Sequence, residues 1–242
     1  MVFLKLGTMT DVILGMGEVG STLYALFTSK KIRVEGKDID DGKCRGEKVE
    51  RPSILHICIP FNDQFITNVG LYDKEYNPSY IIIHSTVKPR TCEKLAEICN
   101  AKIIYSPTRG VHSRFLDDIM RYTKFFAYDG DADHNVSDIF RDRFNQFSKA
   151  KNTKTLELSK ILTDTTYYGL LIGYRKLVDK YVEGYDVDPD ELWGFAEEIH
   201  TFLGNRPIMY NDKKPIGGHC VIPNLELIEG LDEIKKIIDS KL

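Results

Sequence analysis

The sequence predicts an α/β fold, with a Rossmann-type, mostly parallel sheet followed by a long helix and a small all-α domain. Short apolar runs alternate with helical segments through the first part of the 242-residue chain, as in parallel sheets with crossover helices. A glycine-rich turn follows the first apolar run, and residues 156–184 lack proline and carry apolar residues at near-helical spacing. We therefore expect a Rossmann-like domain over residues 1–150 and a helical domain over residues 151–242.

The elements of the first domain follow from apolar runs and the turns between them. Residues 11–14 form the first strand candidate, and residues 21–29 read as a helix after the glycine turn. The remaining strand candidates are residues 32–34, 53–59, 80–84, 101–105 and 124–128, and the helix candidates are residues 91–99 and 136–147. The polar segment 148–155 is the expected domain boundary.

The second domain is predicted to be helical throughout. After the long helix at residues 156–184, Asp188-Pro189-Asp190-Glu191 resembles a helix cap with proline in the first turn. This cap predicts a helix through residues 193–202, and a closing helix is expected near residues 225–238.

The glycine turn Gly15-Met16-Gly17-Glu18-Val19-Gly20 has the spacing of a dinucleotide-binding turn. Because it lies between a strand and a helix, free backbone N–H groups and the helix dipole both point at a bound pyrophosphate. Asp38 lies near the ~20-residue spacing of an acid that binds the ribose hydroxyls, with Asp40 and Asp41 as rivals, and an acid there favours NAD over NADP. Loops after two later strands should face the same ligand, and they contain Pro60, Ser85 and Thr86.

The composition is that of an ordinary soluble globular protein, 42% hydrophobic and 29% charged, with a net charge of −3. This balance gives no electrostatic argument for nucleic acid or an anionic membrane as the main partner. No apolar run approaches the roughly 18 residues of a membrane span, so a cytoplasmic protein is expected. The five cysteines are odd in number and include no CxxC pair, so neither a disulfide framework nor a metal site is expected.

Cys220 ends the segment Gly217-Gly218-His219-Cys220. Two glycines let the backbone pass close to a bound molecule, and the thiol that follows can attack a carbonyl carbon. Together with the glycine turn, this segment predicts a dehydrogenase that captures its own aldehyde product as a thiohemiacetal and oxidises it again.

Taken in order, these motifs resemble the nucleotide-sugar 6-dehydrogenase family, which includes UDP-glucose and UDP-N-acetylmannosamine dehydrogenases. The resemblance runs from residue 11 to about residue 227. Besides the glycine turn, it rests on Ser85-Thr86-Val87 (the family's STV), Tyr105-Ser106-Pro107-Thr108-Arg109 (Y-x-P-E-R), Glu157-Leu158-Ser159-Lys160 (E-L-x-K) and Gly217-Gly218-His219-Cys220 (GGHC). The GGHC form and Arg109 lean toward the N-acetylmannosamine branch.

The resemblance implies that a primary alcohol of a sugar-like substrate is oxidised twice with NAD. It makes Cys220 the nucleophile and Lys160 the cation that stabilises the oxyanion, a role that agrees with the charge of a lysine. Asp164 lies four residues after Lys160 and shares its face on the predicted helix. The substrate-binding residues expected by this resemblance are Arg109, His112, Gly217, Gly218 and His219.

Three positions depart from the family pattern. Thr108 replaces a glutamate assigned to the water of thioester hydrolysis, and a neutral hydroxyl is a poor general base. Asp164 replaces an asparagine and Asn224 replaces an aspartate, two positions that face one another in the family. The carboxylate has thus changed sides, and a base for the water could survive at Asp164, weakened by its closeness to Lys160.

Family members continue into a third domain that grips the nucleotide, which this sequence does not include. Either another chain supplies that domain, or the substrate is not a nucleotide sugar, or the activity has been lost. Two alternatives stay open: a two-electron dehydrogenase or reductase of the hydroxyacid type without a covalent intermediate, and a catalytically silent NAD-binding subunit. A long helix with two apolar faces also predicts a homodimer through that helix.

Overall fold

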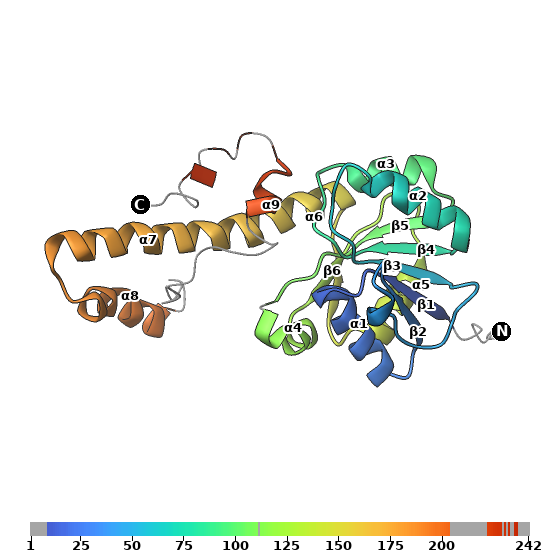
Figure 1. The fold of residues 1–242 in the computed structure, drawn as a ribbon, viewed down its shortest axis with the longest axis horizontal. Coiled ribbons are helices and arrows are strands. Elements are labelled where there is room, and N and C mark those ends of the chain that lie inside the picture. Colours follow the sequence, from blue (N-terminus) through green and yellow to red (C-terminus); the bar gives the residue numbers. More distant parts are fainter. Residues whose placement is uncertain are drawn as a thin grey trace. The chain divides into compact units, whose positions relative to one another are not determined.

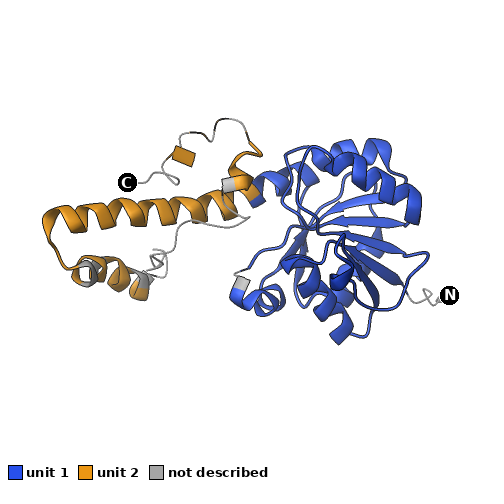
Figure 2. Cartoon of the chain, in the orientation of Figure 1, with its two compact units in different colours: residues 1–160 blue, residues 161–242 orange. Residues whose placement is uncertain are grey.

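The computed structural model describes residues 9–110, 112–203, 222–228, 230, 232, 235 and 236. The chain forms two compact units, residues 1–160 and residues 161–242 (Figure 2). The expected domain boundary at residue 150 falls inside the first unit, before its last helix.

Unit 1 is built on a five-stranded parallel sheet with the order β2-β1-β3-β4-β5 (Figure 1). Its strands are β1 (Thr10–Leu14), β2 (Arg33–Lys37), β3 (Ile54–Ile57), β4 (Tyr80–Ile83) and β5 (Lys102–Tyr105). The helices between them are α1 (Glu18–Ser29), α2 (Phe65–Tyr76), α3 (Thr91–Ile98) and the short η1 (Asp41–Lys43). The predicted Rossmann-type sheet is confirmed, and the order of strands reverses between β1 and β3, where such sheets bind ligands.

Alternation along the strands divides the core into two layers. Residues such as Val12, Leu55 and Ile81 pack with α2, α3 and α6 (Thr153–Ser159), and their neighbours Ile13, Ile54 and Ile82 pack with α1, α4 (Phe115–Arg121) and α5 (His134–Arg143). Both faces of the sheet are therefore covered, which explains why its strands read as nearly continuous apolar runs.

The region after β5 differs from the prediction. The expected last strand at residues 124–128 is β6 (Lys124–Phe126), which pairs in parallel with β7 (Phe147–Lys149) in a separate two-stranded sheet. The helix expected at residues 136–147 ends at Arg143, because Phe144 takes an extended conformation and the chain turns into β7. A strand of three residues is too short to give a periodic signal. The 3-10 turn η2 (His112–Arg114) precedes α4.

Unit 2 contains the long helix, with one local change in its winding. The helical path runs from α6 through a π-helical segment, η3 (Lys160–Thr166), into α7 (Tyr167–Tyr185). The predicted cap is confirmed at α8 (Pro189–Leu203), where Asp188 Oδ1 accepts from Glu191 N at 3.3 Å. The described helical residues near the end of the chain are α9 (Ile222–Leu225) and residues 232, 235 and 236. The closing helix expected near residues 225–238 is interrupted, because residues 226–228 and 230 form turns and a bend, and its other residues lie partly outside the described chain.

Across the described part of the chain, no helix combines the length and the apolar character needed to cross a membrane.

Candidate functional site

The three glycines of the turn between β1 and α1 have different roles in the structure. Gly15 has a φ of +93°, a backbone conformation that favours glycine. A Cβ on Gly15 would also lie 2.8 Å from Cys58 O, so the close approach of the loop after β3 requires glycine at this position too. A Cβ on Gly20 would lie 1.9 Å from Gly15 O, which fixes how closely α1 packs on the turn. Around Gly17, by contrast, no atom of the residues that the structure describes lies within 4 Å of an added Cβ. The exposed backbone at Gly17 is therefore open to a ligand at the N-terminus of α1.

Asp38 follows β2 and holds the same turn. Its Oδ2 accepts from Met16 N at 2.7 Å, and its Oδ1 accepts from Asp40 N at 3.1 Å. Hydrogen bonds from the backbone of Asp40 and Met16 keep the pKa of the Asp38 carboxyl below its usual value. The rival Asp40 instead caps η1 by accepting from Gly42 N at 3.0 Å, and Asp41 is exposed within η1. Asp38 is thus the acid adjacent to the turn.

Gly36 of β2 packs against Met16 of the turn, a contact that the sequence analysis missed. Met16 is buried, and its Sδ would lie 2.4 Å from a Cβ on Gly36. The side chain of Met16 therefore occupies the space that a residue with a side chain in β2 would fill. Glu18 and Val19 begin α1, where Glu18 is exposed and Val19 is half-buried.

The loops after β3 and β4 meet beside the turn. Ser85 Oγ donates to Ile59 O at 2.6 Å, which ties the end of β4 to the loop that continues into Pro60. Pro60 is exposed, and Ser85 and Thr86 are half-buried. An open glycine backbone, a helix N-terminus and a carboxylate after β2 together fit the pyrophosphate and ribose of a dinucleotide.

A lysine that the sequence analysis did not single out organises the loop after β5. The buried Lys124 at the start of β6 donates from Nζ to Ser106 O at 2.9 Å and to Pro107 O at 3.0 Å, and its Nζ lies 3.0 Å from Thr108 Oγ1. Burial lowers the pKa of Lys124 well below its ordinary value, and the cations Lys160 and Arg109 lower it further. The sequence signal for Lys124 was a charged residue at the start of an apolar run.

Three predicted site residues follow β5: Thr108 as a catalytic residue, and Arg109 and His112 as substrate-binding residues. Thr108 is buried, with its N–H donating to His84 O at 3.4 Å. Arg109 donates from Nη2 to Thr123 O at 3.0 Å and lies over the rings of Tyr122 and Phe125. His112 lies in η2.

Glu157 of the E-L-x-K motif anchors α6. Its buried carboxylate accepts from Arg90 N at 2.6 Å and from Cys92 N at 2.9 Å, so it caps the N-terminus of α3. Burial raises the pKa of this carboxyl, while the two backbone N–H groups oppose that rise. Lys160 follows at the first position of η3, so the cap at Glu157 fixes the segment that presents Lys160.

The remaining predicted residues fall in unit 2 or outside the described chain. Asp164 lies in η3 and Asn224 in α9, and both are half-buried. Gly217, Gly218, His219 and Cys220 lie outside the described residues. Within the part of the chain that the structure describes, no cluster of three or more His, Cys, Asp or Glu side chains is placed to hold a metal ion.

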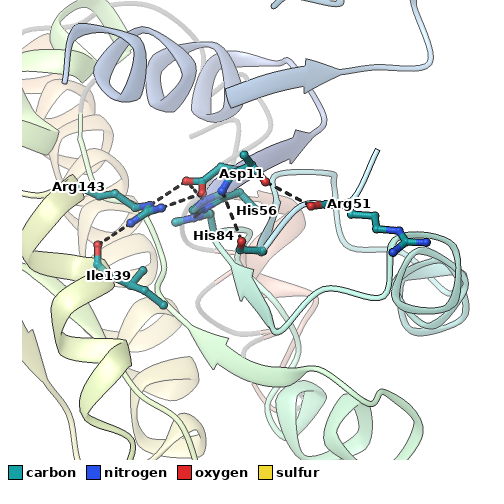
Figure 3. Close-up of polar contacts among 8 residues, drawn as sticks. Asp11, Arg51, His56, His84, Ile139 and Arg143 are labelled. Atoms are coloured by element: carbon teal, nitrogen blue, oxygen red, sulfur yellow. Dashed lines mark hydrogen bonds and ion pairs between the residues drawn. The ribbon is translucent and has the colours of Figure 1, made fainter. Parts of the chain in front are cut away.

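A network of buried polar side chains links Arg143, Asp11, His56 and His84 (Figure 3). Arg143 of α5 donates to both carboxylate oxygens of Asp11, at 2.8 and 2.7 Å. His56 Nε2 lies 3.0 Å from Asp11 Oδ2, His56 Nδ1 lies 2.9 Å from His84 Nε2, and His84 Nδ1 donates to Ser106 O at 3.0 Å. This network ends at Ser106 O, the carbonyl oxygen that also accepts a hydrogen bond from Lys124.

The His56, His84 and Asp11 side chains have pKa values lowered by their surroundings. Burial lowers the pKa of both imidazoles, and the nearby Lys124, in its ammonium form, lowers that of His84 further. Burial alone would raise the pKa of Asp11, but its bonds to His56 and Arg143 lower it. Arg143 and His56 therefore favour an ionised Asp11, whereas burial opposes a charge on either imidazole. Two neutral imidazoles carry two N–H protons, so they can supply two of the three contacts that link Asp11, His56, His84 and Ser106 O.

Comparison with solved structures shows the fold again. The structure is similar to UDP-D-ManNAc dehydrogenase from Pyrococcus horikoshii, with 17% identity and a TM-score of 0.76 over 95% of this chain and 66% of that chain. It is similar to a UDP-glucose dehydrogenase from Pyrobaculum islandicum, with 15% identity and a TM-score of 0.71 over 98% of this chain and 68% of that chain. This chain thus spans about two thirds of the length of these two proteins.

A third similar structure is 3-hydroxyisobutyrate dehydrogenase from Mycobacterium tuberculosis, with 12% identity and a TM-score of 0.71 over 96% of this chain and 92% of that chain. No protein-family model and no curated protein matches the sequence. At these identities, the likeness establishes the shared fold.

Proposed function

We propose that this chain is a dehydrogenase that binds a nicotinamide cofactor at the glycine turn. The observation that carries the proposal is the contrast among the three glycines: packing requires Gly15 and Gly20, whereas a Cβ on Gly17 would meet no atom of the described residues within 4 Å. Because Gly17 is the N-cap residue of α1, its open space leaves the backbone at the helix N-terminus accessible to a ligand. The similar solved structures are dehydrogenases, which supports the same conclusion.

Residues of unit 1 bind and orient the cofactor in this proposal. The N–H groups at the start of α1 bind the pyrophosphate, and Asp38 binds the adenosine ribose. The loops with Pro60, Ser85 and Thr86 lie along the same edge of the sheet and line the path toward the nicotinamide. When bound, the nicotinamide ring accepts a hydride from the substrate carbon.

The proposed cofactor is NAD, because the carboxylate of Asp38 would repel a 2′-phosphate. Isothermal titration of the full chain with NAD and NADP tests this. NAD should bind more tightly than NADP, and Asp38→Ala should weaken NAD and reduce the preference. Equal affinities for the two cofactors in the unaltered protein would contradict the assignment.

For the substrate, we propose a primary alcohol or aldehyde of a sugar-like molecule, oxidised through Cys220. Lys160 would stabilise the oxyanion and Asp164 would be the base for the water that releases the acid, with Asn224 and Thr108 as the other catalytic residues of this proposal. The support is the ordered set of motifs and the likeness to UDP-sugar dehydrogenases. Mass spectrometry of the protein with NAD and candidate alcohols should detect a thioester on Cys220. Two NADH formed per substrate would agree with it.

A two-electron dehydrogenase without a covalent intermediate is the second candidate. Thr108 in place of the family's glutamate favours it, since a hydroxyl alone cannot act as the base for hydrolysis. The likeness to 3-hydroxyisobutyrate dehydrogenase is compatible with it. One NADH per substrate, with no adduct on Cys220, would distinguish this candidate from the first.

A further inference from the structure

The amine of Lys124 is buried in a cage of oxygen atoms. Its side chain belongs to a residue that is 5% exposed, and the two carbonyl oxygens of Ser106 and Pro107 and the hydroxyl of Thr108 surround Nζ at 2.9 to 3.0 Å. Thr108 is 6% exposed, so this contact is shielded from bulk water.

The cage satisfies both protonation states of the lysine. Carbonyl oxygens only accept hydrogen bonds, whereas a hydroxyl both donates and accepts. As an ammonium, Lys124 donates one N–H to each of the three oxygens. As a neutral amine, it donates its two N–H bonds to Ser106 O and Pro107 O, and its lone pair accepts from the Thr108 hydroxyl. A proton can therefore pass between Thr108 and Lys124 without any movement of the backbone.

The charges around Lys124 favour the neutral amine. His84 after β4, Arg109 after β5 and Lys160 after α6 face it, and both Arg109 and Lys160 are cations. Cys58 after β3 is a neutral thiol, because burial raises its pKa to about 12. The face of the Phe144 ring lies 5.5 Å from Nζ and favours the ammonium only weakly. No carboxylate of the described residues contacts Nζ, so burial dominates and lowers the pKa of Lys124.

A small cavity adjoins this pair. It has a volume of about 10 Å³, which is room for about one water molecule or hydroxyl group. Its lining contains both Thr108 and Lys124, together with Pro107, Arg109, Ile119, Tyr122 and Thr123. A water-sized polar group therefore has space beside the Thr108 side chain.

We propose that Lys124 is the proton acceptor behind Thr108 in the dehydrogenation step, an inference that rests on the proposed function. The substrate hydroxyl gives its proton to Thr108 Oγ1, and Thr108 gives its own hydroxyl proton to Lys124 Nζ. The electron pair left on the substrate oxygen forms the carbonyl bond while the hydride leaves the carbon for the oxidised nicotinamide. Lys124 becomes an ammonium and later returns its proton to water. Because Lys124 acts through Thr108, it is a positioning residue.

This pair gives the changed residue at position 108 a chemical role. A threonine hydroxyl alone is a poor base, but a hydroxyl bonded to a neutral amine relays a proton to a good one. The same relay serves the one-oxidation and the two-oxidation candidates, since both begin by removing a hydride and a proton from an alcohol.

The first test measures the lysine itself and needs no substrate. In full-length protein labelled with ¹³C-lysine, the Cε signal of Lys124 is identified by its absence in Lys124→Arg and followed by NMR as the pH changes. We expect Lys124 to titrate well below about 10.4, the value of an ordinary lysine. A midpoint at or above that value would overturn the proposal, whatever the chain oxidises.

The second test uses the dependence of the rate on pH. The wild-type oxidation rate should rise with pH through the Lys124 midpoint found by NMR and then level off. Lys124→Arg, which keeps donors but cannot accept a proton, should lower kcat by about 10²- to 10⁴-fold and lose that rise. Lys124→Met provides a second variant if arginine disturbs the fold. Wild-type rate and pH profile in a folded Lys124 variant would refute the proposal.

Thr108 supplies the matched pair of controls. Thr108→Ser keeps the hydroxyl and should stay within about tenfold of wild type, whereas Thr108→Val removes it and should fall as far as Lys124→Arg. All folded variants should bind the nicotinamide cofactor as wild type does, because Asp38 and the glycine turn are unchanged. Loss of cofactor binding in wild type would defeat the proposed function; equal rates in Thr108→Ser and Thr108→Val would defeat only the relay.

Discussion

At the scale of single residues, we expect a substitution of Gly17 to weaken cofactor binding and a substitution of Gly20 to destabilise the fold. Aspartate is a favourable helix N-cap residue, and a Cβ at position 17 has open space around it, so Gly17→Asp should leave the fold intact. The substitution puts a negative charge where the pyrophosphate would lie. We expect normal thermal unfolding and cofactor binding weakened at least about tenfold, or about 1.4 kcal/mol. Gly20→Ala should instead lower the melting temperature, because its Cβ meets Gly15 O. Unchanged cofactor affinity in Gly17→Asp would show that the turn is structural only.

The buried imidazoles predict how stability depends on pH. The pKa of His84 is depressed in the folded chain, so below about pH 6.5 the unfolded chain binds a proton that the folded chain does not. The contribution is present above that pH and is lost as the pH falls, by up to about 1.4 kcal/mol per pH unit, and His56 acts in the same direction.

Urea unfolding between pH 7 and pH 5 measures this effect. His84→Asn is the matched variant, since its amide can still donate to Ser106 O but does not titrate. Its unfolding free energy should fall less steeply with acidification than that of the wild type. Parallel curves for the two proteins would mean that His84 has the same pKa in the folded and the unfolded chain.

At the scale of elements, α7 has large apolar and aromatic side chains that the described residues of its own chain leave exposed. Only Gly169 and Gly173 are buried in this 19-residue helix, and Tyr174, Tyr181 and Tyr185 are 54%, 56% and 75% exposed. Leu170, Leu177 and Val178 are only half-buried. A helix with so much apolar surface in view is best satisfied by a second copy of the chain.

We propose a homodimer formed through α7, and light scattering tests it. The wild-type chain should have the mass of a dimer at micromolar concentration. Tyr174→Asp should shift it to a monomer, whereas Lys180→Asp, a change at an exposed charged position of the same helix, should not. A monomeric wild-type chain would refute the proposal.

The winding of the helix near Lys160 could not be predicted from the sequence. Residues 156–184 have the apolar spacing of one α-helix, and that pattern does not reveal the π-helical segment η3. A π-segment adds a residue to a turn at a small local cost, and such segments are frequent at functional sites. It contains both Lys160 and Asp164, so the two residues sit on a wider turn than the expected four-residue spacing assumes.

At the scale of the whole molecule, the sheet of unit 1 was predictable because strands that are buried on both faces consist of consecutive apolar residues. The glycine turn and Asp38 were predictable because they are close in sequence and follow a known geometric rule. The cage around Lys124 was not, since its partners are 16 to 18 residues away and are mostly backbone carbonyls. Backbone acceptors leave no mark on composition or periodicity.

The ion pair between Asp11 and Arg143 has a consequence for the synthesis of the chain. Its partners are 132 residues apart, on β1 and α5. While the ribosome is still making the middle of the chain, β1, β2 and β3 are available to pair, yet burying Asp11 without its counter-ion costs several kcal/mol. Nascent chains stalled before α5 should therefore remain sensitive to protease, and chains stalled after β7 should become resistant. We therefore expect the sheet to close around the amino-terminal strand only after Arg143 has been synthesised.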